Sequence, residues 1–248
     1  MNDIYARADA FLFGRRTYEI FAGSWGKMAD PGSNVIGAAL NEKGTTTMKL
    51  TTTIQISVDG VMQANGGSPP ELDGDFARGG WATNHFDDES GGYINEIYLR
   101  AEAFLFGRRT FAFFARTWGI NEEMRAHPIG VALNEKPKYV ASNTITEPSW
   151  ANTTVLSGDL EKAIGELKAK QGGELQVHGS GVLTRWLLQN DLLDELNLLV
   201  MPVVVGAGTR LFPEAGVDVA LELVEARPFP KGVVAQVYRT AGRPVYPA

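Results

Sequence analysis

The sequence predicts an α/β protein: a three-layer α/β/α sandwich built on a mixed sheet. Two observations favour this fold class. From residue 51 onward, short β-like segments alternate with segments of helical periodicity, as in βαβ units with a parallel sheet. Near the end, segments 220–226 and 233–240 read as strands joined around the turn residues 230–232. Such a pair is typical of an antiparallel hairpin, and parallel units followed by a hairpin give a mixed sheet.

Each element follows from a local signal. Strands are expected where β-branched and aromatic residues alternate or run together, and helices where apolar residues recur every three or four positions. The predicted strands are 51–62, 103–106, 138–142, 153–156, 173–177 and 196–205, and the predicted helices are 93–101, 111–118, 159–171 and 182–187. Thr110 suits the N-cap of the second helix. Residues 64–80, rich in Gly, Pro, Asn and Asp, form a long loop of the kind that often borders a pocket.

The segment from Gly173 to Phe212 organises the prediction. It reads as a strand, a glycine turn at 179–181, a helix and a strand buried on both faces. A helix that begins right after a tight turn presents free N–H groups, which bind anions. This pattern predicts a nucleotide site with the turn over the phosphates. Thr184 stands where a dinucleotide fingerprint has its third glycine, so a turn needed only for tight packing is the alternative.

A second candidate anion site lies at residues 107–110. Two adjacent arginines, Arg108 and Arg109, stand where a predicted strand passes into a helix. A phosphate at such a junction would meet both their charges and the helix N–H groups. The alternative is a solvated pair of basic residues.

Composition excludes several classes of protein. The chain has 248 residues and a formal net charge of −6, which argues against a nucleic-acid or anionic-membrane partner. It has no cysteine, so disulfides and thiolate zinc sites are impossible, and its three histidines are too scattered to predict a metal site. No signal peptide or membrane-spanning run is apparent, so we expect a cytoplasmic protein.

The beginning of the chain repeats a later segment. Residues 2–43 align without a gap to 95–136, at a constant offset of 93, and the sequence AFLFGRRT occurs in both. The copy holds only a helix, a strand and a second helix. We therefore expect residues 1–47 to be a truncated partial duplicate with a linker, and 48–248 to be a complete domain. The copy either mediates assembly, at a sheet edge or by exchange with its twin, or is a remnant or gene-model artefact.

Four motifs occur together in one order: SVDGVMQ, FGRRT, VHGSGVL and PVVVGAGTRLFP. In this combination the chain resembles the dihydrofolate reductase-like family. It is most similar to stand-alone relatives of the reductase domain of the bifunctional riboflavin-biosynthesis deaminase-reductase. The resemblance covers residues 48 to about 240. Because the zinc deaminase signature requires cysteine, at most the reductase half is present.

The resemblance implies an NADPH-dependent reductase that forms a homodimer and acts on a small heterocycle, pterin-like or ribosylaminopyrimidine-like. It also implies a cofactor site. The residues that match the family's cofactor-binding positions are Gly107, Arg108, Arg109, Thr110, Ser142, Gly179, Ser180, Gly181, Val182 and Leu183. His178 stands beside this site, where the family often has another glycine, and is a further cofactor-binding candidate; a structural hydrogen-bonding role is the alternative.

The catalytic residues are less clear from the sequence. Asp59 lies in the turn after the first strand, which in the family borders the nicotinamide and substrate, and Asp87 and Asp88 lie just before the next helix. The alternatives are a turn former for Asp59 and an acidic helix flank for the other two. Two further functions stay open: a nucleotide-binding module without turnover, and an assembly protein that uses the N-terminal repeat.

Overall fold

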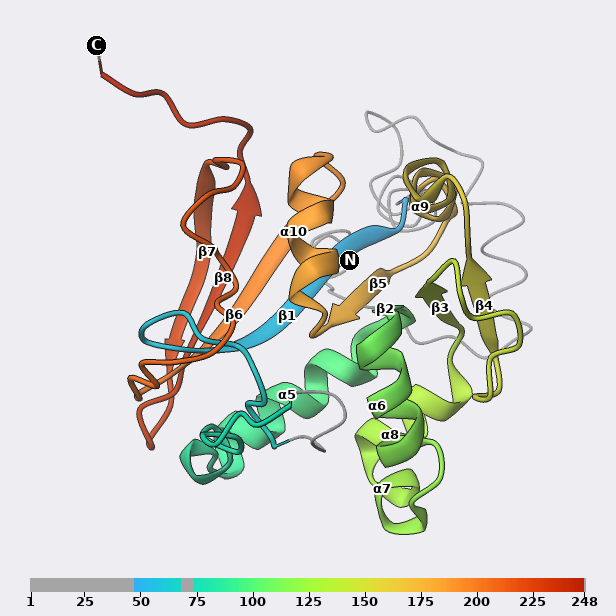
Figure 1. Cartoon of the computed structure of the whole chain (residues 1–248), viewed down its shortest axis with the longest axis horizontal. Coiled ribbons are helices and arrows are strands. Elements are labelled where there is room, and N and C mark those ends of the chain that lie inside the picture. Colours follow the sequence, from blue (N-terminus) through green and yellow to red (C-terminus); the bar gives the residue numbers. More distant parts are fainter. Residues whose placement is uncertain (1–46, 68–73, 248) are drawn as a thin grey trace, which may run out of the picture. The chain divides into compact units, whose positions relative to one another are not determined.

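The computed structural model describes residues 47–67 and 74–247 (Figure 1). The expected partial duplicate lies almost wholly in residues 1–46, outside the described residues, and stays a prediction. The chain divides into two units. One comprises Met1–Met48 with Ala169–Gly172, and the other, which holds the sheet and the site, comprises Lys49–Lys168 with Gly173–Ala248.

The second unit is built on an eight-stranded mixed sheet with the order β4-β3-β2-β5-β1-β6-β8-β7. The first six strands in this order, from β4 at the edge to β6, all pair in parallel. Strand β8 is antiparallel to both of its neighbours, β6 and β7. The strands are β1 Lys49–Ser57, β2 Ala101–Gly107, β3 Lys138–Ala141, β4 Thr153–Leu156, β5 Glu174–His178, β6 Glu195–Met201, β7 Leu221–Pro228 and β8 Val234–Thr240. The predicted α/β class and the C-terminal hairpin are therefore confirmed.

Helices cover both faces of the sheet. Successive crossovers lead first from β1 towards β4 and then back through β5 to β6, and right-handed crossovers running in opposite directions lie on opposite faces. The helices are η1 Thr83–His85, α5 Asp88–Arg100, α6 Arg108–Trp118, α7 Glu122–Ala126, α8 Pro128–Glu135, α9 Leu160–Lys168 and α10 Gly181–Gln189. None of the described helices is both long and apolar enough to cross a membrane.

Strand β1 lies between the two helical layers. On one face, Thr52 Oγ1 lies 3.2 Å from Thr184 Oγ1 of α10. On the other face, Gln176 of the neighbouring β5 donates its amide to the carbonyl of Ile97 in α5 at 2.8 Å. Two apolar clusters complete the α5 side: one joins β2 and β3 to α5, α6 and α8, and the other joins α5 to β6 and β8. Burial on both faces explains the continuous apolar run that predicted β6.

Some boundaries differ from the sequence prediction. Thr110 is not the N-cap of α6, because the chain passes from β2 straight into the helix and Gly107 is the cap. Helix α5 begins five residues earlier than predicted, at Asp88, since Asp87 and Ser90 form a capping box. Strand β6 ends at Met201, next to Pro202, instead of running to 205.

Candidate active site

The two predicted anion-binding turns lie side by side. Strands β2 and β5 are parallel neighbours, so their carboxyl ends, and the turns that follow them, meet at the same edge of the sheet. The Gly107 N–H donates to Ser180 Oγ at 3.0 Å, and Ser180 Oγ donates to Thr110 Oγ1 at 2.7 Å. The structure thus brings together the basic turn and the glycine turn that the sequence singled out separately.

Close approach of the backbones depends on small residues and left-handed conformations. Gly179 has φ +66°, and a Cβ there would contact Thr110 Cγ2 at 3.4 Å. Ser180, the N-cap of α10, also has a left-handed backbone, with φ 58°. These two consecutive positions turn the chain from β5 into the helix and leave little side-chain bulk above the turn.

Both helix ends at this point are suited to bind an anion. Neither Gly107 at the start of α6 nor Ser180 at the start of α10 caps its own helix with a side chain. The N–H groups of both first turns are therefore uncapped by side chains, and both helix dipoles direct their positive ends here. Arg108 and Arg109 add two positive charges, and neither makes an ion pair or hydrogen bond with another described residue.

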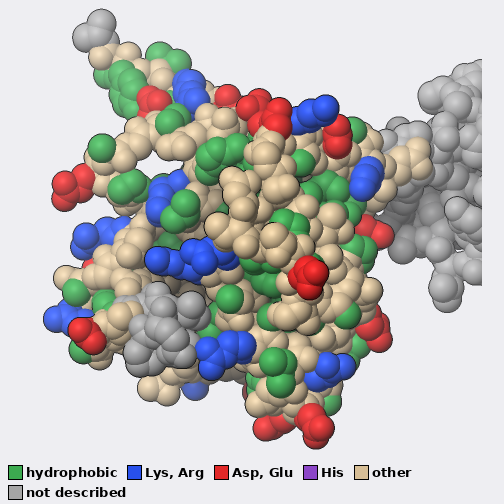
Figure 2. All heavy atoms as spheres, turned by 45° about the vertical axis from the view of Figure 1, so that its right-hand side comes forward, with side chains coloured by type: hydrophobic (Ala, Val, Ile, Leu, Met, Phe, Trp, Pro, Cys, Tyr) green, Lys and Arg blue, Asp and Glu red, His purple; other side chains and the backbone are tan. Residues whose placement is uncertain are grey.

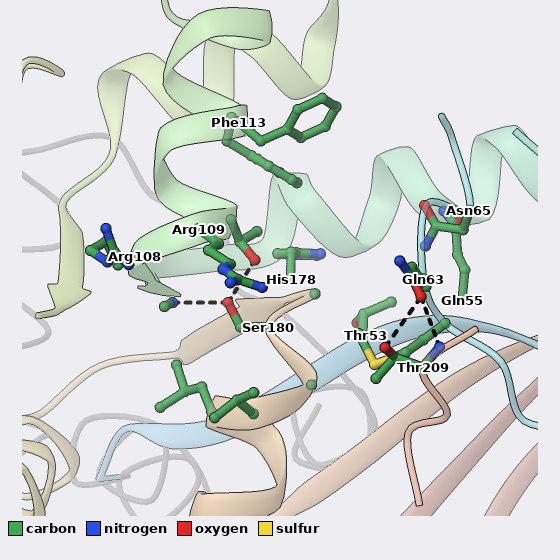
Figure 3. A pocket seen from close by; sticks show the side chains of 18 of the residues that line it. Thr53, Gln55, Gln63, Asn65, Arg108, Arg109, Phe113, His178, Ser180 and Thr209 are labelled. Atoms are coloured by element: carbon green, nitrogen blue, oxygen red, sulfur yellow. Dashed lines mark hydrogen bonds between the residues drawn. The ribbon is translucent and has the colours of Figure 1, made fainter. Parts of the chain in front are cut away.

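These turns border a cavity of about 800 Å³, a volume typical of small-molecule sites. Figure 3 shows Arg108, Arg109 and Ser180 at one end of it, Gln55, Gln63, Asn65 and Thr209 at the other, and His178 between them. Of the predicted cofactor-binding residues, the cavity is lined by Gly107, Arg108, Arg109, Thr110, His178, Gly179, Ser180, Gly181, Val182 and Leu183. Ser142 is not among the lining residues; its Oγ instead accepts from the N–H groups of Thr144 and Ile145.

The far end of the cavity is lined by uncharged amides and hydroxyls. Gln63 Oε1 accepts from the N–H and the hydroxyl of Thr209 at 2.9 and 3.2 Å. Gln55, on β1, lines the cavity without a hydrogen bond from its side chain to any described residue. Sequence reasoning missed these residues, although Gln63 is the last residue of the SVDGVMQ motif. The loop after β1 does border the pocket, as expected, through Ala64, Asn65 and Gly67.

The middle of the cavity holds a buried aromatic pair. The His178 ring stacks on Tyr98 of α5, with 3.8 Å between centroids and an interplanar angle of 15°. Burial, with a smaller contribution from the Arg100 charge, lowers the pKa of His178 to about 3. Burial also raises the pKa of Tyr98. Both side chains are therefore neutral near pH 7.

The three predicted catalytic aspartates lie outside the cavity lining. Asp59 accepts from Ser57 Oγ at 2.6 Å and from the N–H groups of Val205 and Gly206 at 2.9 Å each. These hydrogen bonds hold the pKa of Asp59 well below its usual range.

Asp87 and Asp88 belong to the start of α5. Asp87 caps the helix through the Ser90 N–H and also accepts from the Lys231 N–H, and these bonds lower its pKa. Asp88 is an exposed first-turn residue. Among the cavity-lining residues that the structure describes, the charged side chains are all arginines, Arg108, Arg109 and Arg185.

The surface charge is mixed. On the face shown in Figure 2, acidic and basic side chains are interspersed rather than gathered into one broad basic surface. Within the described part of the chain, no group of three or more His, Asp or Glu residues is arranged to hold a metal ion.

Comparisons with known proteins agree with this architecture. Two uncharacterised proteins of Bacillus subtilis are similar in sequence. YyaP is 28% identical over 151 residues (60% of this chain and 78% of that protein), and YwjB is 22% identical over 180 residues (73% and 91%).

Among solved structures, three share the fold at low sequence identity. A putative riboflavin biosynthesis protein from Shewanella has a TM-score of 0.56 at 23% identity, covering 78% of this chain and 99% of that one. A pyrimidine reductase-like protein from Corynebacterium diphtheriae has a TM-score of 0.52 at 14% identity (78% and 92%). Dihydrofolate reductase from Enterococcus faecalis, solved with NADP(H) and the compound RAB-propyl, has a TM-score of 0.50 at 15% identity (77% and 96%).

The family model of the RibD C-terminal domain matches residues 48–235, which are most of the chain and include strands β1 to β7 and the first two residues of β8. This match confirms the resemblance inferred from the four motifs. The chain belongs to the RibD C-terminal domain family, with a dihydrofolate reductase-like fold.

Proposed function

We propose that this protein is an NADPH-dependent reductase of a small heterocyclic substrate, of the pterin or ribosylaminopyrimidine type. One observation carries the proposal. Two helix N-termini without side-chain caps and two arginines without partners among the described residues converge on one cavity, joined through Ser180. A pyrophosphate and a further phosphate suit such a site, because each would meet N–H donors and positive charge.

The residues present fit NADPH. The glycine turn 179–181 would lie against the pyrophosphate, and Arg108 and Arg109 would hold phosphate charge, including that of the 2′-phosphate. When bound, the cofactor supplies the hydride. The chain itself binds and orients both ligands: its basic end holds the phosphates, and its uncharged end, with Gln55 and Gln63, holds the heterocycle. The E. faecalis dihydrofolate reductase of the same fold, solved with NADP(H), supports this assignment.

A nucleotide-binding module without turnover is the second candidate, and one observation favours it. None of the cavity-lining residues that the structure describes is a carboxylate that could orient or protonate a substrate. In a reductase with this lining, the proton that accompanies the hydride would reach the substrate from water.

Two measurements test the proposal. Isothermal titration should show that NADPH binds more tightly than NADH, because NADH lacks the 2′-phosphate. Loss of absorbance at 340 nm on adding dihydrofolate or a ribosylaminopyrimidine would then distinguish a reductase from a binding module. Equal or absent binding of the two nucleotides would overturn the NADPH assignment. The homodimer and the cytoplasmic location stay predictions. Light scattering would measure whether the protein is a dimer.

A further inference from the structure

A chain of hydrogen-bonded side chains leads from the surface into the middle of the cavity and ends at His178. Arg100 Nε donates to Glu174 Oε1 at 2.9 Å. Gln176 Nε2 donates to Glu174 Oε2 at 2.7 Å and to the Ile97 carbonyl at 2.8 Å. Gln176 Oε1 in turn lies 3.0 Å from His178 Nε2. Each member of this chain orients the next.

This series of hydrogen bonds fixes the tautomer of His178. A glutamine amide nitrogen carries two hydrogens, and both acceptors next to Gln176 Nε2 are oxygens that bear no proton to donate. The other amide atom, Oε1, can only accept. His178 Nε2 must therefore be the donor in its bond to Gln176, which leaves Nδ1 as an unprotonated nitrogen with a lone pair.

That lone pair has no hydrogen-bond partner in the described part of the chain, and the residue that carries it lines the cavity. Among the described residues, Asn197 Oδ1 is the one side-chain N or O atom that is fully buried and lacks a hydrogen-bond partner. His178 Nδ1 is therefore not fully buried and unpaired in this sense. Nδ1 has no hydrogen bond from the described chain, so it keeps accessible surface, and the residue lines the cavity. Stacking on Tyr98 and the bond to Gln176 prevent the ring from turning away.

We propose that Nδ1 of His178 is a fixed hydrogen-bond acceptor that selects ligands with an N–H donor at the middle of the cavity. The inference rests on the proposed function. Two ligand groups have this chemistry: the carboxamide of the nicotinamide ring, and a ring N–H or amino group of the heterocycle. A carbonyl at the same place would face the lone pair and be rejected. Because burial keeps the imidazole neutral, its acceptor role does not reverse near pH 7.

The first test pairs a protein change with a ligand change. His178→Phe keeps a flat ring on Tyr98 but removes the nitrogen. The ligand pair is NADP⁺ and its 3-acetylpyridine analogue, in which a methyl ketone replaces the carboxamide. If the carboxamide is the donor, the wild-type protein should prefer NADP⁺ by roughly 3- to 10-fold, the range of a neutral hydrogen bond, and the variant should bind the two about equally.

A second arm tests the heterocycle as the donor. With NADP⁺ saturating, lumazine and N3-methyllumazine are compared in the same two proteins. A preference for the N–H ligand that disappears in His178→Phe supports the proposal in either arm. His127→Phe, the same substitution outside the cavity, is the matched control and should change neither ratio. If His178→Phe weakens both members of each pair equally, its role is structural and the proposal is overturned.

A third readout does not depend on any ligand. In protein labelled with ¹⁵N at histidine, NMR should show His178 protonated at Nε2 and unprotonated at Nδ1 at pH 7. The opposite tautomer would refute the inference even if NADP⁺ binds. Failure of both nucleotides to bind, with this tautomer present, would instead count against the proposed function.

Discussion

Arg108 and Arg109 are adjacent, both line the cavity, and neither is neutralised by a described residue. An arginine that serves a 2′-phosphate contributes to NADPH binding but not to NADH binding, because only NADPH carries that phosphate. We therefore expect Arg108→Gln to weaken NADPH by about 10- to 100-fold, the loss of a charged hydrogen bond, and NADH by much less.

The control for this prediction is Arg239→Gln. Arg239 is exposed on the C-terminal hairpin, away from the cavity lining, where it pairs loosely with Glu222. Arg239→Gln should leave the dissociation constants of NADPH and NADH unchanged. Titration of each nucleotide into each variant measures the effect, and an equal loss for NADPH and NADH in Arg108→Gln would contradict a 2′-phosphate role.

His178 makes stability depend on pH. Its pKa is about 3 when folded, against about 6.5 in an unfolded chain, so on acidification the unfolded state binds the proton first. The free energy of unfolding therefore falls as pH drops from about 6.5 towards 3. Between pH 7 and pH 5 this one residue should account for a loss of about 2 kcal/mol. Urea unfolding at pH 7 and pH 5 measures the free energy of unfolding. The loss between the two pH values should be smaller in His178→Phe than in the wild-type protein by about that amount, and an identical loss in both proteins would contradict the prediction.

At the scale of elements, the contact between the β2–α6 and β5–α10 turns depends on Gly107. A Cβ at this position would lie 2.8 Å from Ser180 Oγ and 3.2 Å from Ser180 Cβ, so Ser180 would have to shift, which disturbs its hydrogen bonds to Gly107 and Thr110. We expect Gly107→Ala to cost about 1–3 kcal/mol of stability and to weaken NADPH binding. Gly165→Ala is the matched control, because its Cβ would meet nothing within 4 Å and alanine favours the helix at this exposed position of α9. Chemical denaturation and titration of both variants measure this, and equal behaviour would show that the turns do not need their close contact.

Asp59 ties the turn after β1 to the segment after β6. Its two oxygens accept from Ser57 and from the N–H groups of Val205 and Gly206, and Arg210 lies 3.5 Å away. Asp59→Asn replaces one acceptor oxygen by a donor, so we expect a lower midpoint of urea unfolding. Asp88→Asn, in an exposed position, should change the midpoint little. Loss of turnover in Asp59→Asn with an unchanged midpoint would instead favour a catalytic role.

At the scale of the whole molecule, local patterns in the sequence predicted the fold, through alternating strands and helices. Glycines and arginines next to strand ends also singled out residues that lie together at the basic end of the cavity, and their role in cofactor binding stays a prediction. The uncharged end depends on contacts between distant segments: Gln63 meets Thr209, 146 residues away. Likewise, β1 pairs with β5 and places Thr53 next to His178, a register that no local pattern reveals. The acidic residues near α5 lie outside the cavity lining, since helix capping attracts the same side chains, and their catalytic role stays a prediction.

The repeat at the start of the chain permits a test of which part of the molecule is sufficient. The eight described strands and the cavity-lining residues that the structure describes lie between Lys49 and Thr240, and the family model begins at residue 48. A chain that starts at Thr47 therefore keeps the described sheet and this cavity lining. We expect it to fold with the same circular dichroism spectrum and to bind NADPH with the affinity of the full chain, within about twofold, as equal contacts require. Light scattering of both chains measures assembly, and an unchanged number of subunits would exclude a role of the repeat in oligomerisation. A truncated chain that is unfolded or unable to bind would instead show that residues 1–46 are part of the functional unit.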